Sequence, residues 1–226
     1  MHPAWYNASM IKAVIFDMDG LLIDSEPLWK EAEVAVFIGV GVPLSYEMTD
    51  QTMGLRTDEV VAYWHQRYPW TGRSPESVGA EIDGGALQLI KEKAEPKAGV
   101  EEAIGVCESM GLPMAIASSS SMAIINAVVE KLGVGHKFTV IHSAEFEAYG
   151  KPHPAVYLSA ADKLGVNPGS CLAFEDSANG VLSAKAAKMH CIAVPDPELR
   201  HDKRFGIADV VVDSLLNITP EIIQSL

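Results

Sequence analysis

Short apolar runs alternate along most of the chain with stretches whose apolar residues recur at the spacing of an amphipathic helix. The runs that predict buried strands are residues 12–16, 113–117, 138–141, 171–174, 191–194 and 209–212. The stretches that predict helices between them are residues 99–110, 122–132, 155–164 and 178–187. Strands that alternate with helices through short connections favour an α/β fold, a parallel, doubly wound, Rossmann-like sheet with right-handed crossovers.

Residues 27–93 interrupt this alternation, because their apolar residues keep helical spacing without the continuous run of a buried strand. We therefore predict a helical cap domain at residues 27–93. It is inserted into a core domain made of residues 1–26 and 94–226, with hinges near residues 21–26 and 95–99. A cap of this kind can close over a site, exclude water and position a substrate.

Composition limits the class of partner. With 226 residues and 48% hydrophobic content, the chain can bury roughly 70% of its unfolded surface, enough for a core domain and a smaller insertion. The formal net charge is −13, from 30 acidic and 17 basic residues. This balance argues against nucleic acid or an anionic membrane as partners, since no basic stripe offsets phosphate repulsion. A phosphorylated substrate would therefore need local positive charge from a metal ion, a lysine or helix N-termini.

The cysteines and the N-terminal region indicate the compartment. Cys107, Cys171 and Cys191 are widely spaced without a Cys-x-x-Cys pair, which is typical of reduced thiols in a cytosolic protein. No basic-then-apolar leader precedes Lys12, and no apolar run approaches 18 residues. We expect a cytoplasmic monomer, with residues 1–9 as a short extension outside the fold.

The tetrad Asp17-Met18-Asp19-Gly20 directly follows the first predicted strand. Open parallel sheets bind ligands at the carboxyl ends of their strands, so two carboxylates two residues apart would face one cleft. One can attack as a nucleophile while the other transfers protons. The alternative is a strand that simply ends in an acidic turn. A calcium loop fits poorly, because the EF-hand pattern has its glycine at the sixth position.

Further chemical signals follow three later stretches. Residues 118–121 are all serine, Lys151 lies in Gly-Lys-Pro-His-Pro, and Glu175-Asp176 lies in Phe-Glu-Asp-Ser-Ala-Asn-Gly. Each has an ordinary interpretation taken singly: a helix N-cap, a solvated loop charge and a surface acidic pair. An α/β sheet would bring all of them to one edge, which favours a shared site. Carboxyl groups that converge there would repel one another without a cation. Oxygen ligands suit a hard ion such as magnesium, whereas the scattered histidines lack zinc-ligand spacing.

This set of motifs resembles the haloacid dehalogenase superfamily of phosphohydrolases. The matching pieces are Asp17 to Gly20, Ser118 after its strand, Lys151 in its motif, and Glu175-Asp176. The resemblance extends from about residue 11 to residue 212. Within the superfamily the chain resembles the subgroup with a helical cap. The stretch from Phe16 to Trp29 is most similar to phosphatases of 2-deoxyglucose 6-phosphate and related hexitol phosphates, a group near the β-phosphoglucomutases.

The resemblance implies a role for each motif residue. Asp17 would attack the phosphorus and form an aspartyl-phosphate, while Asp19 would serve as the general acid and base. Ser118 and the main-chain amide of Ser119 would hold phosphate oxygens, and Lys151 would balance the charge of the transition state. The expected partner is a small phosphorylated metabolite.

The resemblance also implies a magnesium site. Its ligands would be the Asp17 side chain, the main-chain carbonyl of Asp19 and the Asp176 carboxylate, with Glu175 binding the ion directly or through water. In the cap, Arg56 could reach into the cleft as a substrate contact, although a surface role is an equal alternative.

Three other activities share this framework. A β-phosphoglucomutase-like phosphosugar mutase has the same core and cap, but these mutases carry a histidine twelve residues after the nucleophile, where this chain has Trp29. Dehalogenases lack an acid two residues after the nucleophile, so Asp19 argues against them. A non-catalytic phosphosugar-binding regulator would be expected to lose the nucleophile, yet Asp17 is present. The sequence therefore favours a magnesium-dependent sugar phosphatase.

Overall fold

The computed structural model describes residues 11–226, and the extension expected at residues 1–9 lies outside them. The strands are β1 (Ala13–Phe16), β2 (Met114–Ser118), β3 (Val140–Ser143), β4 (Cys171–Glu175), β5 (His190–Ala193) and β6 (Val210–Val211). The α-helices are α1 (Glu26–Gly39), α2 (Tyr46–Thr49), α3 (Thr57–Arg67), α4 (Pro75–Lys93), α5 (Val100–Ser109), α6 (Met122–Leu132), α7 (Ala155–Leu164), α8 (Ala178–Ala186) and α9 (Pro220–Gln224).

The strands form one sheet in the order β3-β2-β1-β4-β5-β6, and every neighbouring pair is parallel. This confirms the predicted doubly wound α/β fold. Strand β3 begins two residues later than its apolar run suggested. Phe138 instead follows a short 3₁₀ turn and packs edge-on against Phe16, with ring centroids 5.8 Å apart. The chain moves outward from β1 to β2 and β3, then returns to β4 on the other side, so a switch point lies beside β1.

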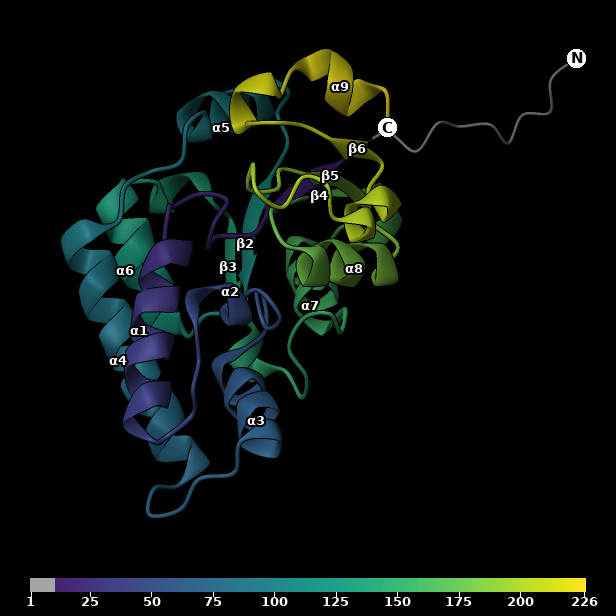
Figure 1. Cartoon of the computed structure of the whole chain (residues 1–226). Coiled ribbons are helices and arrows are strands. Elements are labelled where there is room, and N and C mark those ends of the chain that lie inside the picture. Colours follow the sequence, from purple (N-terminus) through teal and green to yellow (C-terminus); the bar gives the residue numbers. More distant parts are fainter. Residues whose placement is uncertain (1–10) are drawn as a thin grey trace, which may run out of the picture.

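The two faces of the sheet carry different apolar residues. Val14 and Phe16 lie in a cluster with residues of α5, α6 and α9, whereas Ala13 and Ile15 face α7 and α8. Alternation along β1 therefore follows the period of two expected for a strand, although both faces are buried, as helices on each side require. Figure 1 shows α7 and α8 to the right of β2 and β3, and α6 to the left of these two strands.

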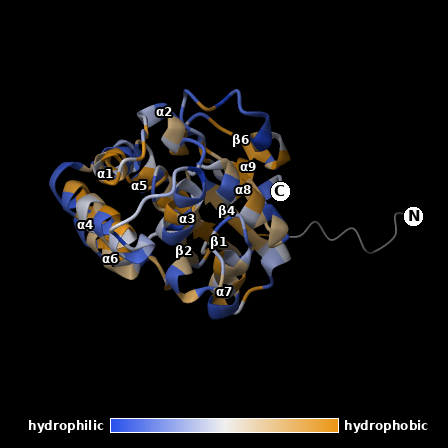
Figure 2. Ribbon diagram, turned by 60° about the horizontal axis from the view of Figure 1, so that its bottom comes forward, coloured by the Kyte–Doolittle hydropathy of each residue, from blue (hydrophilic) through white to orange (hydrophobic). Residues whose placement is uncertain are grey.

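Within the connection between β1 and β2, residues 26–93 form helices α1 to α4, which confirms the helical character expected there, and α5 follows them. These helices have an apolar cluster of their own, which includes Phe37, Val60, Trp64 and Ile82. In Figure 2 helix α4 carries both hydrophobic and hydrophilic positions, as an amphipathic helix does. The helices therefore pack as a unit, called the cap below. The exact bounds of the cap and core domains stay predictions.

Two neighbouring chain segments link the cap to the core. The Asp24 amide donates to the Glu95 carbonyl at 2.8 Å, and the Lys97 amide donates to the Leu22 carbonyl at 3.1 Å. Ile23 forms a β-bridge with Pro96 between them. The segments that enter and leave the cap thus run side by side, close to the sequence-predicted hinges. Among residues 11–226, no helix has both the length and the apolar character needed to cross a membrane.

Candidate active site

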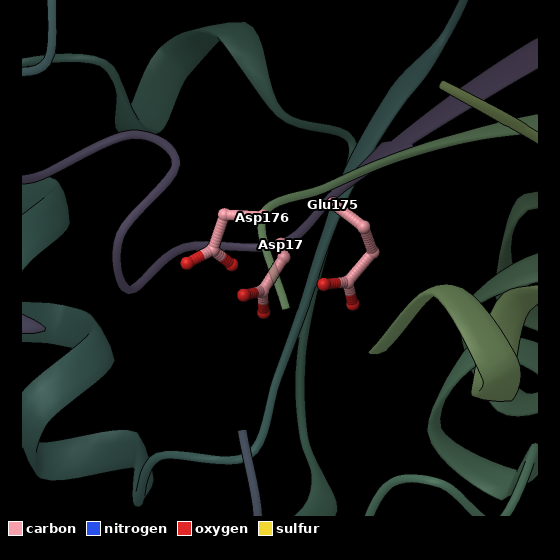
Figure 3. Close-up of side chains that lie close together, drawn as sticks. All are labelled: Asp17, Glu175 and Asp176. Atoms are coloured by element: carbon pink, nitrogen blue, oxygen red, sulfur yellow. The ribbon is translucent and has the colours of Figure 1, made fainter. Parts of the chain in front are cut away.

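Three carboxyl groups meet at the carboxyl ends of β1 and β4. Asp17 directly follows β1, Glu175 ends β4 and Asp176 comes next. The parallel register pairs Phe16 with Phe174, and the Asp17 amide donates to the Phe174 carbonyl at 3.0 Å. One oxygen from each of the three carboxyl groups lies within 4.8 Å of the others. Figure 3 shows the three side chains pointing into the same space.

Lys151 is buried between two of these carboxylates. Its side chain is 1% exposed, and Nζ lies 2.6 Å from Asp17 Oδ1 and 2.6 Å from Glu175 Oε1. The Tyr157 hydroxyl donates to the same Glu175 oxygen. Burial lowers the pKa of Lys151, but Asp17 and Glu175 more than compensate and the pKa rises above its usual value. Lys151 is therefore a fixed positive charge beside the predicted nucleophile.

The carboxyl cluster carries more negative charge than Lys151 can balance. Burial raises the pKa of Asp17 to about 7, helped by Glu175 and opposed by Lys151. The pKa of Asp176 is raised well above its usual range by burial and by Asp17. Its buried Oδ1 has no hydrogen-bond partner among the described residues. Such an arrangement fits a hard divalent cation, because Mg²⁺ prefers carboxylate oxygens and would satisfy the unpartnered atom.

Two glycines allow the chain to approach this cluster. A Cβ on Gly20, which has φ +74°, would lie 2.0 Å from Asp176 Oδ2. A Cβ on Gly180, in the first turn of α8, would lie 1.9 Å from Glu175 Oε2. Any side chain at either position would displace a carboxylate of the predicted metal site, since real contacts are not this short. Steric exclusion of a side chain thus explains why each of the two sequence motifs has a glycine at this position.

Asp19 is held by donors from both the core and the cap. Its Oδ1 accepts from Ser25 Oγ at 2.7 Å and from Trp29 Nε1 at 3.0 Å. Its Oδ2 accepts from Ser120 Oγ at 2.6 Å and from Ser118 Oγ at 3.4 Å. These bonds fix the carboxylate two residues beyond the predicted nucleophile, at the same cleft. A carboxylate held in this way is suited to proton transfer to and from a bound substrate.

The serine run starts at Ser118, the last residue of β2. Ser118 and Ser119 both line the cleft that contains Asp17. The Ser118 hydroxyl accepts a hydrogen bond from the Ser120 amide at 3.0 Å, and Ser119 Oγ donates to the Gly54 carbonyl at 2.8 Å. The hydroxyl of Ser119 therefore contacts the cap. This leaves its main-chain amide as the group expected to bind phosphate.

Core and cap residues share one cleft. The core contributes Asp17, Asp19, Ser118, Ser119, Ser120, Lys151, Asp176 and Ser177. The cap side contributes Glu26, Trp29, Lys30, Glu33, Thr49, Thr52, Met53, Gly54, Leu55, Thr57 and Val60. The core residues of the cleft, called the floor below, come mainly from the strand ends and include the predicted catalytic residues. The cap residues, called the wall below, are rich in polar side chains. This layout suits a small polar ligand held between two layers.

Arg56 lies at the junction between cap and core, outside the lining of this cleft. Its Nη1 donates to the main-chain carbonyls of Ala144 and Glu147, each at 2.8 Å, and its Nε and Nη2 pair with Asp58. Because these partners occupy the guanidinium, the structure does not show the expected approach to a substrate. In this structure Arg56 connects the cap to the segment that follows β3, and its contact with a substrate stays a prediction.

Several residues of the site were not singled out from the sequence. Ser25 and Ser120 contact Asp19, Tyr157 contacts Glu175, and the wall includes Glu26 and Glu33. Ser120 could have been identified from the sequence, because it belongs to the serine run that begins at the end of β2. The sequence does not single out Tyr157, since a tyrosine among the apolar residues of a helix is normally interpreted as part of the hydrophobic core.

Comparisons with known proteins agree with this geometry. A model for the family described as haloacid dehalogenase-like hydrolase matches residues 11–188. Hexitol phosphatase B of Escherichia coli (strain K12) is 46% identical over 211 residues, which cover 92% of this chain and 95% of that protein. The phosphorylated carbohydrates phosphatase of Thermotoga maritima is 28% identical over 217 residues, covering 94% of this chain and 100% of the relative.

Solved structures show the same likeness. CbbY from Rhodobacter sphaeroides, in complex with phosphate, has a TM-score of 0.85 at 26% identity, covering 96% of this chain and 100% of that one. A β-phosphoglucomutase from Clostridium difficile has a TM-score of 0.82 at 26% identity, covering 96% of each chain. Both the family match, which spans most of the chain, and the strand-end carboxyl cluster lead to one conclusion. The chain belongs to the haloacid dehalogenase-like hydrolases.

Proposed function

We propose that this protein is a phosphoric monoester hydrolase that removes phosphate from small phosphorylated sugars. The substrates would be hexitol or hexose phosphates, including 2-deoxyglucose 6-phosphate. The observation that carries the proposal is the convergence of Asp17, Asp19 and Lys151 on one cleft, beside the Asp176 carboxylate. The substrate class is supported by the 46% identical relative, which is named hexitol phosphatase B.

Each residue would have a defined part in the reaction. Asp17 attacks the phosphorus in line, and the bond from phosphorus to the sugar oxygen breaks as an aspartyl-phosphate forms. Asp19 gives a proton to the departing sugar oxygen. It then takes a proton from the water that hydrolyses the aspartyl-phosphate, which restores Asp17 and releases inorganic phosphate. Lys151 would stabilise the charge that develops on the transferring group, with Ser118 and the Ser119 amide holding its oxygens.

The proposed cofactor is Mg²⁺. Asp17, Asp176 and the main-chain carbonyl of Asp19 would bind it, with Glu175 beside them. When bound, the ion supplies positive charge that offsets the repulsion between a carboxylate nucleophile and a phosphate. The cytoplasmic location, the monomeric state and the exclusion of nucleic acid and membranes stay predictions from the sequence.

A phosphosugar mutase is the second candidate, because the structural relatives include a β-phosphoglucomutase. Trp29 argues against it in this chain. Its indole N–H is a donor only, and it is already bonded to Asp19. A mutase must keep water away from the aspartyl-phosphate until a sugar hydroxyl is phosphorylated. The side chain at position 29 cannot accept a proton from that hydroxyl.

Phosphorus NMR separates the two activities. The full-length enzyme, supplied with Mg²⁺ and a hexose phosphate, is expected to form inorganic phosphate in step with substrate loss. A phosphate-release assay over a panel of phosphorylated metabolites then ranks the substrates. Growth of an isomeric sugar phosphate with little free phosphate would overturn the hydrolase assignment in favour of the mutase.

A further inference from the structure

Helix α1 presents a row of polar side chains to the cleft. Glu26, Trp29, Lys30 and Glu33 recur at spacings of three and four residues, so they lie on one face of the helix, and all four line the cleft. The row begins beside Asp19, which accepts a hydrogen bond from Trp29. From Glu26 to Glu33 the helix rises by about 10 Å.

Most polar groups of this wall already have partners. Lys30 Nζ pairs with Asp50 Oδ1 at 2.6 Å. The hydroxyls of Thr49 and Thr52 donate to main-chain carbonyls, at 2.6 Å and 3.1 Å. Trp29 is likewise bonded to the Asp19 carboxylate. These groups are therefore committed to the protein itself.

Glu33 differs from its neighbours on the wall. Its Oε2 is shielded from solvent and has no hydrogen-bond partner among the described residues. A buried carboxyl oxygen without a donor is costly, so the position calls for a donor that the protein does not provide. Burial raises the pKa of Glu33 to about 8, against the influence of Lys30. A carboxyl group of this kind can both accept and donate hydrogen bonds near neutral pH.

The groups around the cleft offer little to bind a second anionic group on the substrate. Glu26 and Glu33 add two carboxyl groups to those of the floor. Among the described residues that line the cleft, the cations are Lys30 and Lys151, and each is already paired with a carboxylate. A further phosphate or carboxylate at the far end of the substrate would therefore meet acidic groups without a free cation. Leaving such a charge unpaired in a partly buried site is strongly unfavourable.

From these observations we infer that Glu33 is a specificity-determining residue that binds a hydroxyl group on the leaving sugar. The cap wall thereby selects monophosphates of neutral, extended polyols and sugars. It rejects substrates with a second phosphate or a carboxylate. The inference rests on the proposed phosphatase function and deepens it. This preference for a single phosphate would distinguish the chain from CbbY of Rhodobacter sphaeroides, a mutant of which was solved in complex with xylulose-(1,5)bisphosphate.

Glu33→Ala tests the hydroxyl contact, with Glu33→Gln as an isosteric second variant. The control is Glu31→Ala, because Glu31 lies on the same helix but pairs with Lys93 at 3.2 Å and is 46% exposed. The full-length Mg²⁺ enzyme is assayed with sorbitol 6-phosphate and with p-nitrophenyl phosphate, whose leaving group lacks further hydroxyls. The measured quantity is the ratio of the two kcat/KM values, and thermal midpoints establish that each variant is folded.

In Glu33→Ala this ratio is expected to fall about tenfold or more, as when a site loses a hydrogen bond to a substrate hydroxyl. Glu33→Gln should retain much of it, since an amide can donate and accept, and Glu31→Ala should leave it unchanged. An unchanged ratio in folded Glu33→Ala overturns the inference while the phosphatase assignment stands. If the wild-type enzyme releases phosphate from neither compound, the proposed function itself fails.

A second measurement tests the exclusion of charge. Sorbitol 6-phosphate and 6-phosphogluconate share a carbon chain and differ at its far end, where one has a hydroxyl and the other a carboxylate. The wild-type enzyme is expected to favour sorbitol 6-phosphate by about tenfold or more in kcat/KM. Above the pKa of Glu33, which is about 8, Glu33→Gln should narrow that preference, because it then removes a negative charge from the wall. Equal rates with the two compounds in the wild-type enzyme would contradict the inference.

Discussion

The floor and the wall of the cleft are built in different ways. The floor consists of residues at the strand ends, in a fixed parallel register. Its positive charge is Lys151, whose Nζ lies 2.6 Å from an oxygen of Asp17 and 2.6 Å from an oxygen of Glu175. The wall consists of cap helices that pack around their own apolar cluster. Its contacts with the floor include hydrogen bonds such as Trp29 to Asp19 and Asn179 to the Met53 carbonyl.

This difference teaches how the two regions share the work. Catalysis requires atoms to be held in place closely, and the register of a buried sheet provides that. Selection among leaving groups requires a surface that can vary without disturbing the chemistry, and cap helices with an apolar cluster of their own provide that. Substitutions in the floor should therefore slow turnover of every substrate, whereas substitutions in the wall should change the order of substrates.

Asp17→Asn is the largest expected break in the floor. The amide keeps the volume of the side chain but cannot attack phosphorus, while Lys151 keeps its second partner, Glu175. We expect kcat to fall at least about 10³-fold with every substrate, as when a nucleophile is removed from other hydrolases. Asp24→Asn is the matched control, because Asp24 is exposed and pairs with Lys97 outside the cleft. Activity of Asp17→Asn within tenfold of the wild type would exclude Asp17 as the nucleophile.

The metal and pH response of the floor is the next largest effect. In the metal-free protein, burial raises the pKa of Asp17 to about 7 from 3.8, and that of Glu26 to about 8 from 4.5. Between pH of about 4 and about 8, these two carboxyl groups therefore hold more protons in the folded state than in the unfolded chain. The free energy of unfolding of the metal-free protein thus falls as pH rises through this range. A bound cation opposes this loss because it stabilises the ionised carboxylates.

Removal of the metal with EDTA should therefore abolish phosphate release and lower the thermal midpoint more at pH 8 than at pH 6. Added Mg²⁺ should reverse both changes. Sodium chloride at matched ionic strength controls for simple charge screening. Full activity in the chelator, or a midpoint at pH 8 that does not respond to Mg²⁺, would contradict the proposed cation site.

The sequence predicted the floor far better than the wall. Asp17 follows a strongly apolar run directly and Asp176 follows one after a single residue, and the topology of an α/β sheet places such positions at one edge. The wall has no such rule. Which residues of a cap helix face a cleft depends on how the cap is docked, so Glu33 could not be distinguished from Glu31 two residues earlier.

Arg56 shows the same limit from the opposite direction. Its place in the cap sequence suggested a substrate contact. Whether a long cationic side chain turns towards a cleft or towards nearby carbonyls depends on tertiary partners. The carbonyls of Ala144 and Glu147 are about ninety residues away along the chain and carry no recognisable sequence signal. The structure alone shows that they accept from Arg56.

Arg56→Ala is the smallest expected effect and tests the contact between the two regions. Glu59 joins Arg56 there, since its Oε1 accepts from the Gly150 amide at 2.9 Å, one residue before Lys151. Loss of the guanidinium should weaken cap docking and lower kcat/KM about three- to tenfold, because hydrogen bonds of this kind contribute about 0.5–1.5 kcal/mol each. The effect should be similar for sorbitol 6-phosphate and p-nitrophenyl phosphate, as Arg56 does not line the cleft.

Arg73→Ala is the control, because Arg73 pairs with Glu81 within the cap. A selective loss with sorbitol 6-phosphate would instead restore Arg56 as a substrate contact.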